Sequence, residues 1–262
     1  MIRLIRVELL KLRTTRLSYG LLVTAAGLTA LFSVIEAARA GSVKGVEPLY
    51  TAAGLDTVLA GGVFALILAA VFGVTVSSGE FRHATATQTY LATPRRGRVL
   101  AAKTAAGACG GAVVGLVGYV IALGVGLAFV AARGYHVAIG DATLARYGIG
   151  HMVAAALMAA VGVALGSLIR SQLAGVIIVF VETIVLESVL GGLFNSIQPY
   201  LPYTAGTTLG GTAQGRAAFG PANGASTTAT PLPFAAATAL LAALAVLLAV
   251  LAARTTVRRD VG

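Results

Sequence analysis

The sequence predicts an all-α membrane protein with six transmembrane helices, and three observations support this fold class. Apolar residues make up 58% of the chain and charged residues 11%, with a mean hydropathy of +0.91, which excludes a soluble globular domain and a disordered chain. Six apolar stretches are each 19 residues or longer, and about 20 residues cross a hydrocarbon core. Basic residues gather in alternate connections. The stretches are 17–35, 58–78, 104–132, 147–169, 173–195 and 234–253.

The basic residues also orient the predicted bundle. The two tails and the second and fourth connections carry 14 of the 19 Lys and Arg residues, and the other three connections carry five. These basic segments are 1–16, 79–103, 170–172 and 254–262. Because Lys and Arg are enriched in cytoplasmic loops, we expect a multi-pass protein of the cell membrane with both termini in the cytoplasm. No connection is long enough for a second folded domain, so residues 1–262 are expected to form one transmembrane domain.

Residues 2–16 have the pattern of an amphipathic helix. Ile2, Ile5, Leu9 and Leu12 recur at helical spacing, and basic side chains occupy the rest of the helical wheel. Such a helix is suited to lie flat at the inner membrane interface before the first span. Glu8 and Lys11 stand at i and i+3, where opposite charges can pair.

The third and fourth spans are rich in regularly spaced glycine. Gly107, Gly111 and Gly115 repeat every four residues in the third span, and Gly162 and Gly166 do so in the fourth. In lipid, small residues let helix backbones approach closely. We therefore interpret these faces as helix-packing surfaces.

The fifth span contains two acidic residues, Glu182 and Glu187. A carboxylate in the middle of a membrane costs on the order of 3 kcal/mol, so both are candidates for function. In an ideal α-helix they lie about 140° apart, which argues against a paired-carboxylate catalytic site. His151 is expected at a similar depth to Glu187 and is a candidate partner for it. A transport role and a structural role, as protonated acids within the bundle, both stay open.

The long connection 196–233 has two interpretations. Its 38 residues include five Pro and six Gly, and Arg216 is its only charge. This weak polarity predicts short re-entrant helices packed against protein before the last span. The alternative is a flexible exterior loop.

Sequence signatures of enzymes are missing. The chain has no G-x-x-x-x-G-K-[ST] phosphate-binding sequence, no H-E-x-x-H zinc sequence and no G-x-S-x-G around Ser167. Its three histidines are widely scattered, and Cys109 is the only cysteine. We therefore expect no catalytic residues, no metal site and no cofactor on this chain. The basic residues lie near span ends and form no stripe with aromatics, so no nucleic-acid partner is expected.

The connection between the second and third spans carries the most specific motif, SGEFRHATATQTYLATPRRGRVLAAK at 78–103. Glu80 and Arg82 open it, a Thr-rich stretch predicted to be helical follows, and Pro94 ends that stretch. This loop resembles the first cytoplasmic loop of ABC transporter permeases of the type-2 export class, which has a Glu-x-Arg element, a Gly-Thr or similar pair, a Pro-x-Arg stretch and a Lys at the start of the third helix. The matching positions are Glu80, Arg82, Thr85, Pro94, Arg95, Arg98 and Lys103. Ala84 stands where the family often has Gly. The resemblance extends to the Glu8-Leu9-x-Lys11-x-Arg13 element, the six spans and the long fifth connection.

The resemblance implies a permease subunit of an ATP-driven exporter, with an interfacial N-terminal helix and a cytoplasmic coupling helix. It implies that ATP and Mg bind a separate ABC-type ATPase subunit, and that a second permease subunit, identical or different, completes the pathway in the bilayer. The segments expected to touch the ATPase are the interfacial helix and 80–92. The ATPase-coupling candidates are Glu8, Lys11, Arg13, Glu80, Arg82, Thr85, Pro94, Arg95 and Arg98.

Other functions remain open beside this resemblance. The expected cargo is amphipathic or hydrophobic, such as a drug, antibiotic, peptide or lipid, and the sequence does not choose among them. One alternative is a proton-coupled secondary transporter that uses Glu182 or Glu187. Another is an assembly protein of the membrane without transport activity.

Overall fold

The computed structural model describes residues 1–42, 46–82, 96–136, 139–211 and 230–255. Within these ranges the chain is helical and contains no strand. Six helical segments are long and apolar enough to cross a membrane, which confirms the predicted fold class. Their bounds are Arg16–Arg39, Ala52–Glu80, Gly97–Ala132, Asp141–Ile169, Gln172–Leu193 and Phe234–Arg254.

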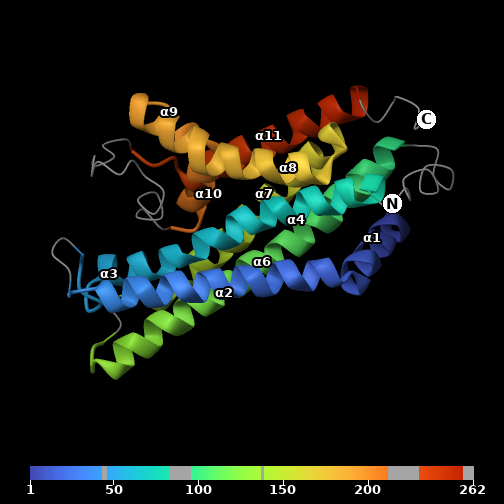
Figure 1. Cartoon of the computed structure of the whole chain (residues 1–262). Coiled ribbons are helices and arrows are strands. Elements are labelled where there is room, and N and C mark those ends of the chain that lie inside the picture. The colour runs from blue at the N-terminus through green and yellow to red at the C-terminus, as the bar shows by residue number, and fades with distance from the viewer. Residues whose placement is uncertain (43–45, 83–95, 137–138, 212–229, 256–262) are drawn as a thin grey trace.

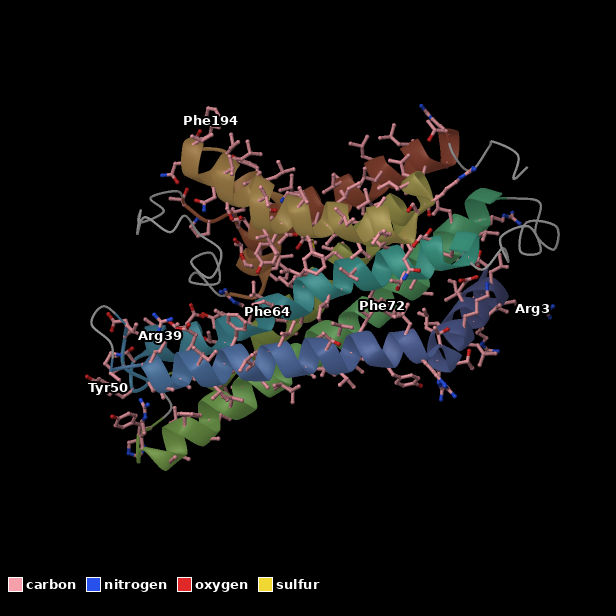
Figure 2. All side chains as sticks on the ribbon, in the orientation of Figure 1. Arg3, Arg39, Tyr50, Phe64, Phe72 and Phe194 are labelled. Atoms are coloured by element: carbon pink, nitrogen blue, oxygen red, sulfur yellow. The ribbon has the colours of Figure 1, made fainter. Side chains whose placement is uncertain are left out.

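The N-terminal amphipathic helix is also present. Helix α1 (Ile2–Thr14) ends at Thr15, whose backbone is extended, and α2 (Arg16–Arg39) begins directly after it at a different angle (Figure 1). Figure 1 places α1 and the C-terminal end of α11 (Phe234–Arg254) at the same end of the bundle. Figure 2 shows Arg3 at this end, whereas Arg39, Tyr50 and Phe194 lie at the opposite one. This arrangement agrees with an even number of crossings.

The second and third spans begin earlier than the hydropathy pattern predicts. The second consists of α3 (Ala52–Leu59), one 3₁₀ turn (Ala60–Gly62) and α4 (Val63–Arg82). The third is α6 (Arg96–Ala132). Its basic first turn was expected to belong to the connecting loop because of its charge, but it is helical. In the third span helical hydrogen bonding continues past the apolar segment because arginine is a good helix former.

Helices α4, α6 and α7 (Asp141–Ile169) form the centre of the bundle, and glycines set their spacing. An added Cβ atom would lie 2.5 Å from the Ala155 carbonyl oxygen at Gly111, and 2.0 Å from the Ala70 carbonyl oxygen at Gly162. Such distances are shorter than any real carbon–oxygen contact, so these helices pack backbone against backbone. The predicted packing role of the glycines in the third and fourth spans is confirmed.

The fifth span contains one irregular turn. It runs from α8 (Gln172–Phe180) through a π-helical turn (Val181–Leu186) into α9 (Glu187–Leu193). The second span is the most buried of the six, and the first, fifth and sixth expose most of their apolar surface. Those outer surfaces are the ones available to lipid or to another subunit.

Short helices precede the last span, as one of the two interpretations predicted. A 3₁₀ turn (Gln198–Tyr200) leads into α10 (Pro202–Leu209), which packs against α7, α11 and α4. Tyr203, Thr204 and Thr207 are buried there. A flexible exterior loop is therefore the wrong description of 198–209, and residues 212–229 lie outside the described part of the chain.

Candidate functional site

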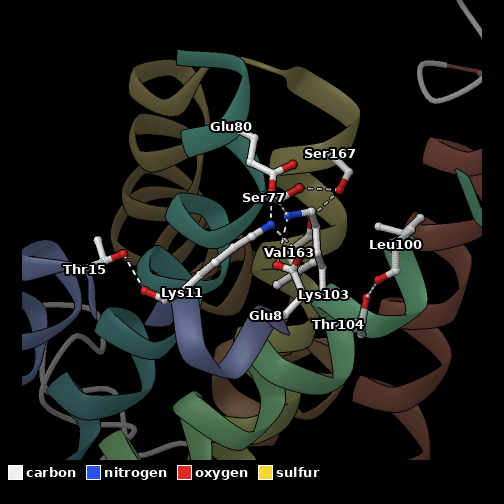
Figure 3. Close-up of polar contacts among 10 residues, drawn as sticks. All are labelled: Glu8, Lys11, Thr15, Ser77, Glu80, Leu100, Lys103, Thr104, Val163 and Ser167. Atoms are coloured by element: carbon white, nitrogen blue, oxygen red, sulfur yellow. Dashed lines mark hydrogen bonds and ion pairs between the residues drawn. The ribbon is translucent and has the colours of Figure 1, made fainter. Parts of the chain in front are cut away.

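The most concentrated charge cluster joins α1 to the two helices that flank residues 83–95. Lys11 Nζ lies 2.8 Å from Glu8 Oε1 and 2.8 Å from Glu80 Oε1. Lys103 Nζ lies 3.1 Å from Glu8 Oε2 and 2.6 Å from Glu80 Oε1. Each ammonium thus bridges both carboxylates, and Figure 3 shows the four side chains converging from α1, α4 and α6. We call these four residues the interfacial charge cluster.

Local sequence places each member of the interfacial charge cluster. Glu8 and Lys11 share one face of α1 because they are three residues apart. Glu80 lies in the last turn of α4, and Lys103 lies about two turns into α6. The cluster therefore fixes the interfacial helix to the end of one span and the start of the next.

Burial distinguishes the two cations of the cluster. The Lys103 side chain is 5% exposed and that of Lys11 is 43% exposed. Burial lowers the pKa of Lys11, but its hydrogen bonds and charge interactions with Glu8 and Glu80 more than offset this, so the pKa lies above its ordinary value. Lys11 therefore stays charged at neutral pH. Leaving a buried ion without its partner destabilises a fold by about 3–5 kcal/mol. Removing Lys103 would leave the buried carboxylates of Glu8 and Glu80 with only the half-exposed Lys11, so we expect it to cost more than removing Lys11.

A cavity of about 410 Å³ opens beside the interfacial charge cluster. Glu8, Lys11 and Glu80 form its charged wall, and Thr75 and Gln172 complete it from α4 and α8. The cluster is thus accessible from one side and buried on the other.

The structure brings together only part of the predicted coupling set. Glu8, Lys11 and Glu80 meet, joined by Lys103, which belongs to the motif at 78–103 but not to the predicted coupling candidates. Arg13 and Arg98 are exposed outside the cluster. The side chain of Arg82 and the residues Thr85, Pro94 and Arg95, with most of the 80–92 segment, lie outside the described part of the chain.

The intramembrane acids are arranged differently from the prediction. Glu182 and Glu187 were expected on different faces of an ideal helix, but in the structure their side chains lie close enough for their charges to interact. The cause is the π-helical turn, in which the backbone N–H of Glu187 donates to the carbonyl oxygen of Glu182. Five residues then make slightly more than one turn, so the two side chains share a face.

Glu187 also caps a second element. Its carboxylate accepts hydrogen bonds from the backbone N–H groups of Tyr203 and Thr204 and from Thr204 Oγ1, the last two at 2.9 and 2.8 Å. These donors belong to the first turn of α10, whose N-cap residue, Leu201, has no side-chain acceptor. An anion at a helix N-terminus satisfies free N–H groups and the helix dipole. The helix begins with Leu201 and Pro202, whose side chains cannot accept a hydrogen bond. This start was the feature of the sequence that indicated a cap from another element.

His151 is not the partner of Glu187, so that prediction is wrong. Its Nδ1 lies 2.9 Å from the Tyr147 carbonyl oxygen, and its ring packs beside Tyr119 with centroids 5.4 Å apart. The Nε2 and Cδ2 side of the ring faces Gly62, and the Cε1 side faces Gly210. The imidazole therefore fills space between the 3₁₀ turn of the second span and the end of α10.

Ser167 occupies a structural position. Its hydroxyl donates to the Val163 carbonyl oxygen at 2.9 Å and lies 2.5 Å from Ser77 Oγ, linking α7 to α4 (Figure 3). Among the described residues, no three His, Cys, Asp or Glu side chains are placed to hold a metal ion.

Comparison with protein-family models and with curated proteins gives no match for this chain.

Proposed function

We propose that this chain is the membrane subunit of an ATP-driven exporter that moves an amphipathic or hydrophobic molecule outward. In this proposal both termini are cytoplasmic, a separate ABC-type ATPase binds ATP and Mg, and a second permease subunit completes the pathway. The motif at 78–103 and the Glu8-Leu9-x-Lys11-x-Arg13 element support the family assignment by their resemblance to type-2 export permeases.

The interfacial charge cluster is the single observation that carries the proposal. It joins three elements, and two of them, α4 and α6, lead directly into and out of the segment that would receive the ATPase. A displacement of that segment would therefore move α1 and both spans together. The glycine contacts between α4, α6 and α7 would transmit the movement, since backbones in contact cannot yield by rotating side chains.

A proton-coupled transporter is the second candidate, and the proximity of Glu182 and Glu187 on one face of the fifth span is the observation that favours it. Paired acids in a membrane can hold and release one proton. Against it, Glu187 is engaged by three donors of α10, which explains its presence without transport.

The two candidates predict different energy sources. We expect the chain to copurify with an ABC-type ATPase, and the complex in proteoliposomes to export cargo on addition of ATP and Mg without a pH gradient. Transport that follows the pH gradient and ignores ATP would favour the second candidate. Recovery of the chain without any ATPase would contradict the proposal.

A substitution in the cluster tests coupling directly. Glu80→Ala removes the carboxylate that bridges Lys11 and Lys103, so we expect ATP hydrolysis to continue while export falls about tenfold or more, a coupling loss of at least about 1.4 kcal/mol. Both rates are measured on the same reconstituted complex.

The matched control is Glu36→Ala, which removes an i, i+3 ion pair with Arg39 at the opposite end of the bundle. We expect it to leave the ratio of export to hydrolysis unchanged. An unchanged ratio in Glu80→Ala as well would remove the cluster from the coupling mechanism.

A further inference from the structure

A second cavity, separate from the interfacial charge cluster, lies on the other side of α1. Its volume is about 480 Å³, within the range of about 300–1,000 Å³ found for small-molecule sites. It opens between α1, the start of α2 and the middle of α6, and Phe72 of α4 forms part of its floor. We call it the α1 groove.

The walls of the α1 groove are apolar and two cations mark its rim. Leu9, Leu10 and Val113 line it, and Arg6 and Arg13 belong to the same lining. Arg6 and Arg13 stand seven residues apart on α1, about two turns or roughly 10 Å, on either side of the leucines. In the described part of the chain neither guanidinium takes part in an ion pair.

A glycine lets α6 pack closely on Phe72 of α4 at the floor of the groove. Gly110 forms part of the floor beside Phe72, and an added Cβ atom would lie 2.4 Å from Cε1 of that ring. Cys109, the only cysteine of the chain, is exposed in the same floor. The interior of the groove is thus apolar, and α1 lies at its opening. Within the described residues, Arg6 and Arg13 of this amphipathic helix make no ion pair.

This combination of charge and apolarity selects one class of ligand. Free phosphate would leave the apolar walls without a partner, and a neutral hydrocarbon would leave Arg6 and Arg13 unused. We infer that the α1 groove binds an anionic membrane phospholipid, with an acyl chain against Leu9, Leu10 and Val113 and the phosphate at Arg6 and Arg13. Basic pockets next to membrane helices recognise such headgroups, and a guanidinium pairs well with phosphate.

Binding of lipid at this position has a mechanical consequence. The opposite face of α1 carries Glu8 and Lys11, so one helix would be held by ions on one side and by lipid on the other. The anionic lipid would therefore stabilise the docked position of α1. This role does not depend on the cargo or on the energy source for transport.

The test uses Cys109 as a native reporter. The full chain in detergent is treated with a fluorescent maleimide, with dioleoyl-phosphatidylglycerol or dioleoyl-phosphatidylcholine added at equal amounts. We expect the phosphatidylglycerol to slow modification about tenfold when about nine-tenths of the grooves are filled, since only empty grooves react. Phosphatidylcholine and inorganic phosphate should have little effect.

Paired variants separate recognition from general surface charge. The double variant Arg6→Gln, Arg13→Gln should lose the protection, and Arg6→Lys, Arg13→Lys should retain part of it. The control Arg3→Gln, Arg16→Gln removes the same number of charges from exposed positions outside the groove and should behave as the unaltered chain (Figure 2 shows Arg3).

Several results would overturn the inference. Cys109 would be protected from modification equally by both lipids, by inorganic phosphate alone, or by neither lipid. Alternatively, the Arg6→Gln, Arg13→Gln and Arg3→Gln, Arg16→Gln variants would lose the protection equally. If the Arg6→Gln, Arg13→Gln chain does not fold, the comparison of the two lipids on the unaltered chain still decides.

Discussion

At the scale of single residues, Glu187 shows how an acid is accommodated in an apolar helix. Its carboxyl group receives three hydrogen bonds from α10. An acceptor buried without donors costs roughly 1–3 kcal/mol or more, so these contacts offset the burial. The same contacts attach the re-entrant helix to the fifth span.

The contribution of this cap can be measured. Glu187→Gln leaves one acceptor oxygen and places an amide N–H₂ group against backbone N–H donors. We expect a loss of about 1–3 kcal/mol in the free energy of unfolding and a lower Tm. Because the chain has no Trp, circular dichroism in detergent is the suitable measurement.

The neighbouring acid supplies the comparison for Glu187. Glu182→Gln keeps the hydrogen bond from Thr183 within reach, at 3.2 Å in the native chain, and leaves the three hydrogen bonds between Glu187 and α10 in place. We expect its effect to be smaller than that of Glu187→Gln. A larger effect would show that the acid pair, and not the helix cap, is the main stabilising feature.

The two acids also show where prediction from sequence fails. Their types and their span were predictable, but their mutual orientation was not. The expected angle of about 140° assumed a regular α-helix, and one π-helical turn changed it. No residue type in 181–186 specifies that turn; α10 contacts the residue directly after it, Glu187, which no pattern in the sequence predicts.

At the scale of helices, glycine spacing was the more reliable signal. The glycine repeats in the third and fourth spans predicted close packing. The third span does pack against the backbone of α7, and the fourth span packs against the backbone of α4. The meeting of α1 with α4 and α6 was predictable only in part. Glu8 and Lys11 were an expected pair, but the bridge from Lys103 to Glu8 joins residues 95 positions apart and depends on how the helices are arranged in space.

A pair of Gly→Ala variants tests this packing. At Gly162 a Cβ atom would meet three backbone atoms, at 2.0, 2.9 and 3.0 Å, none of which can rotate away. We expect Gly162→Ala to separate α4 from α7 and to cost about 1–3 kcal/mol. Thermal unfolding in detergent gives the change in stability.

The matched control lies in the same bundle. Gly124 of α6 has no atom within 4 Å of an added Cβ. Gly124→Ala should be neutral or stabilise by up to about 1 kcal/mol, because Ala has the higher helix propensity. If both variants lower stability equally, close packing at Gly162 is not the cause.

At the scale of the whole molecule, sequence predicted the number and order of the helices more accurately than their ends. Hydropathy identifies the apolar segments, but it does not mark where hydrogen bonding stops. Helices α3 and α6 therefore begin before the apolar segments do. The connection 196–233 had two interpretations because its composition suits both, and contacts with α7 and α11 show that 198–209 includes short packed helices.

The orientation in the membrane is open to a direct test. In a Cys109→Ser background, single cysteines are placed at Thr15 and Ser42, which are exposed just beyond the two ends of the first span's helix. We expect a membrane-impermeant maleimide to label Ser42→Cys in intact cells, and Thr15→Cys only after permeabilisation, because the basic tails favour the cytoplasm. The reverse pattern would place the interfacial charge cluster outside the cell and contradict the proposed function.

The central position of α4 has a consequence for biogenesis. During synthesis, α4 is complete at residue 82, whereas its main partner α7 ends at residue 169. The Gly73 face, which in the finished fold contacts the Ala159 carbonyl oxygen, is therefore without its partner until nearly twice as much chain has been made. Until then this face must rest against lipid or the insertion machinery, so the second span is the segment most dependent on help during insertion.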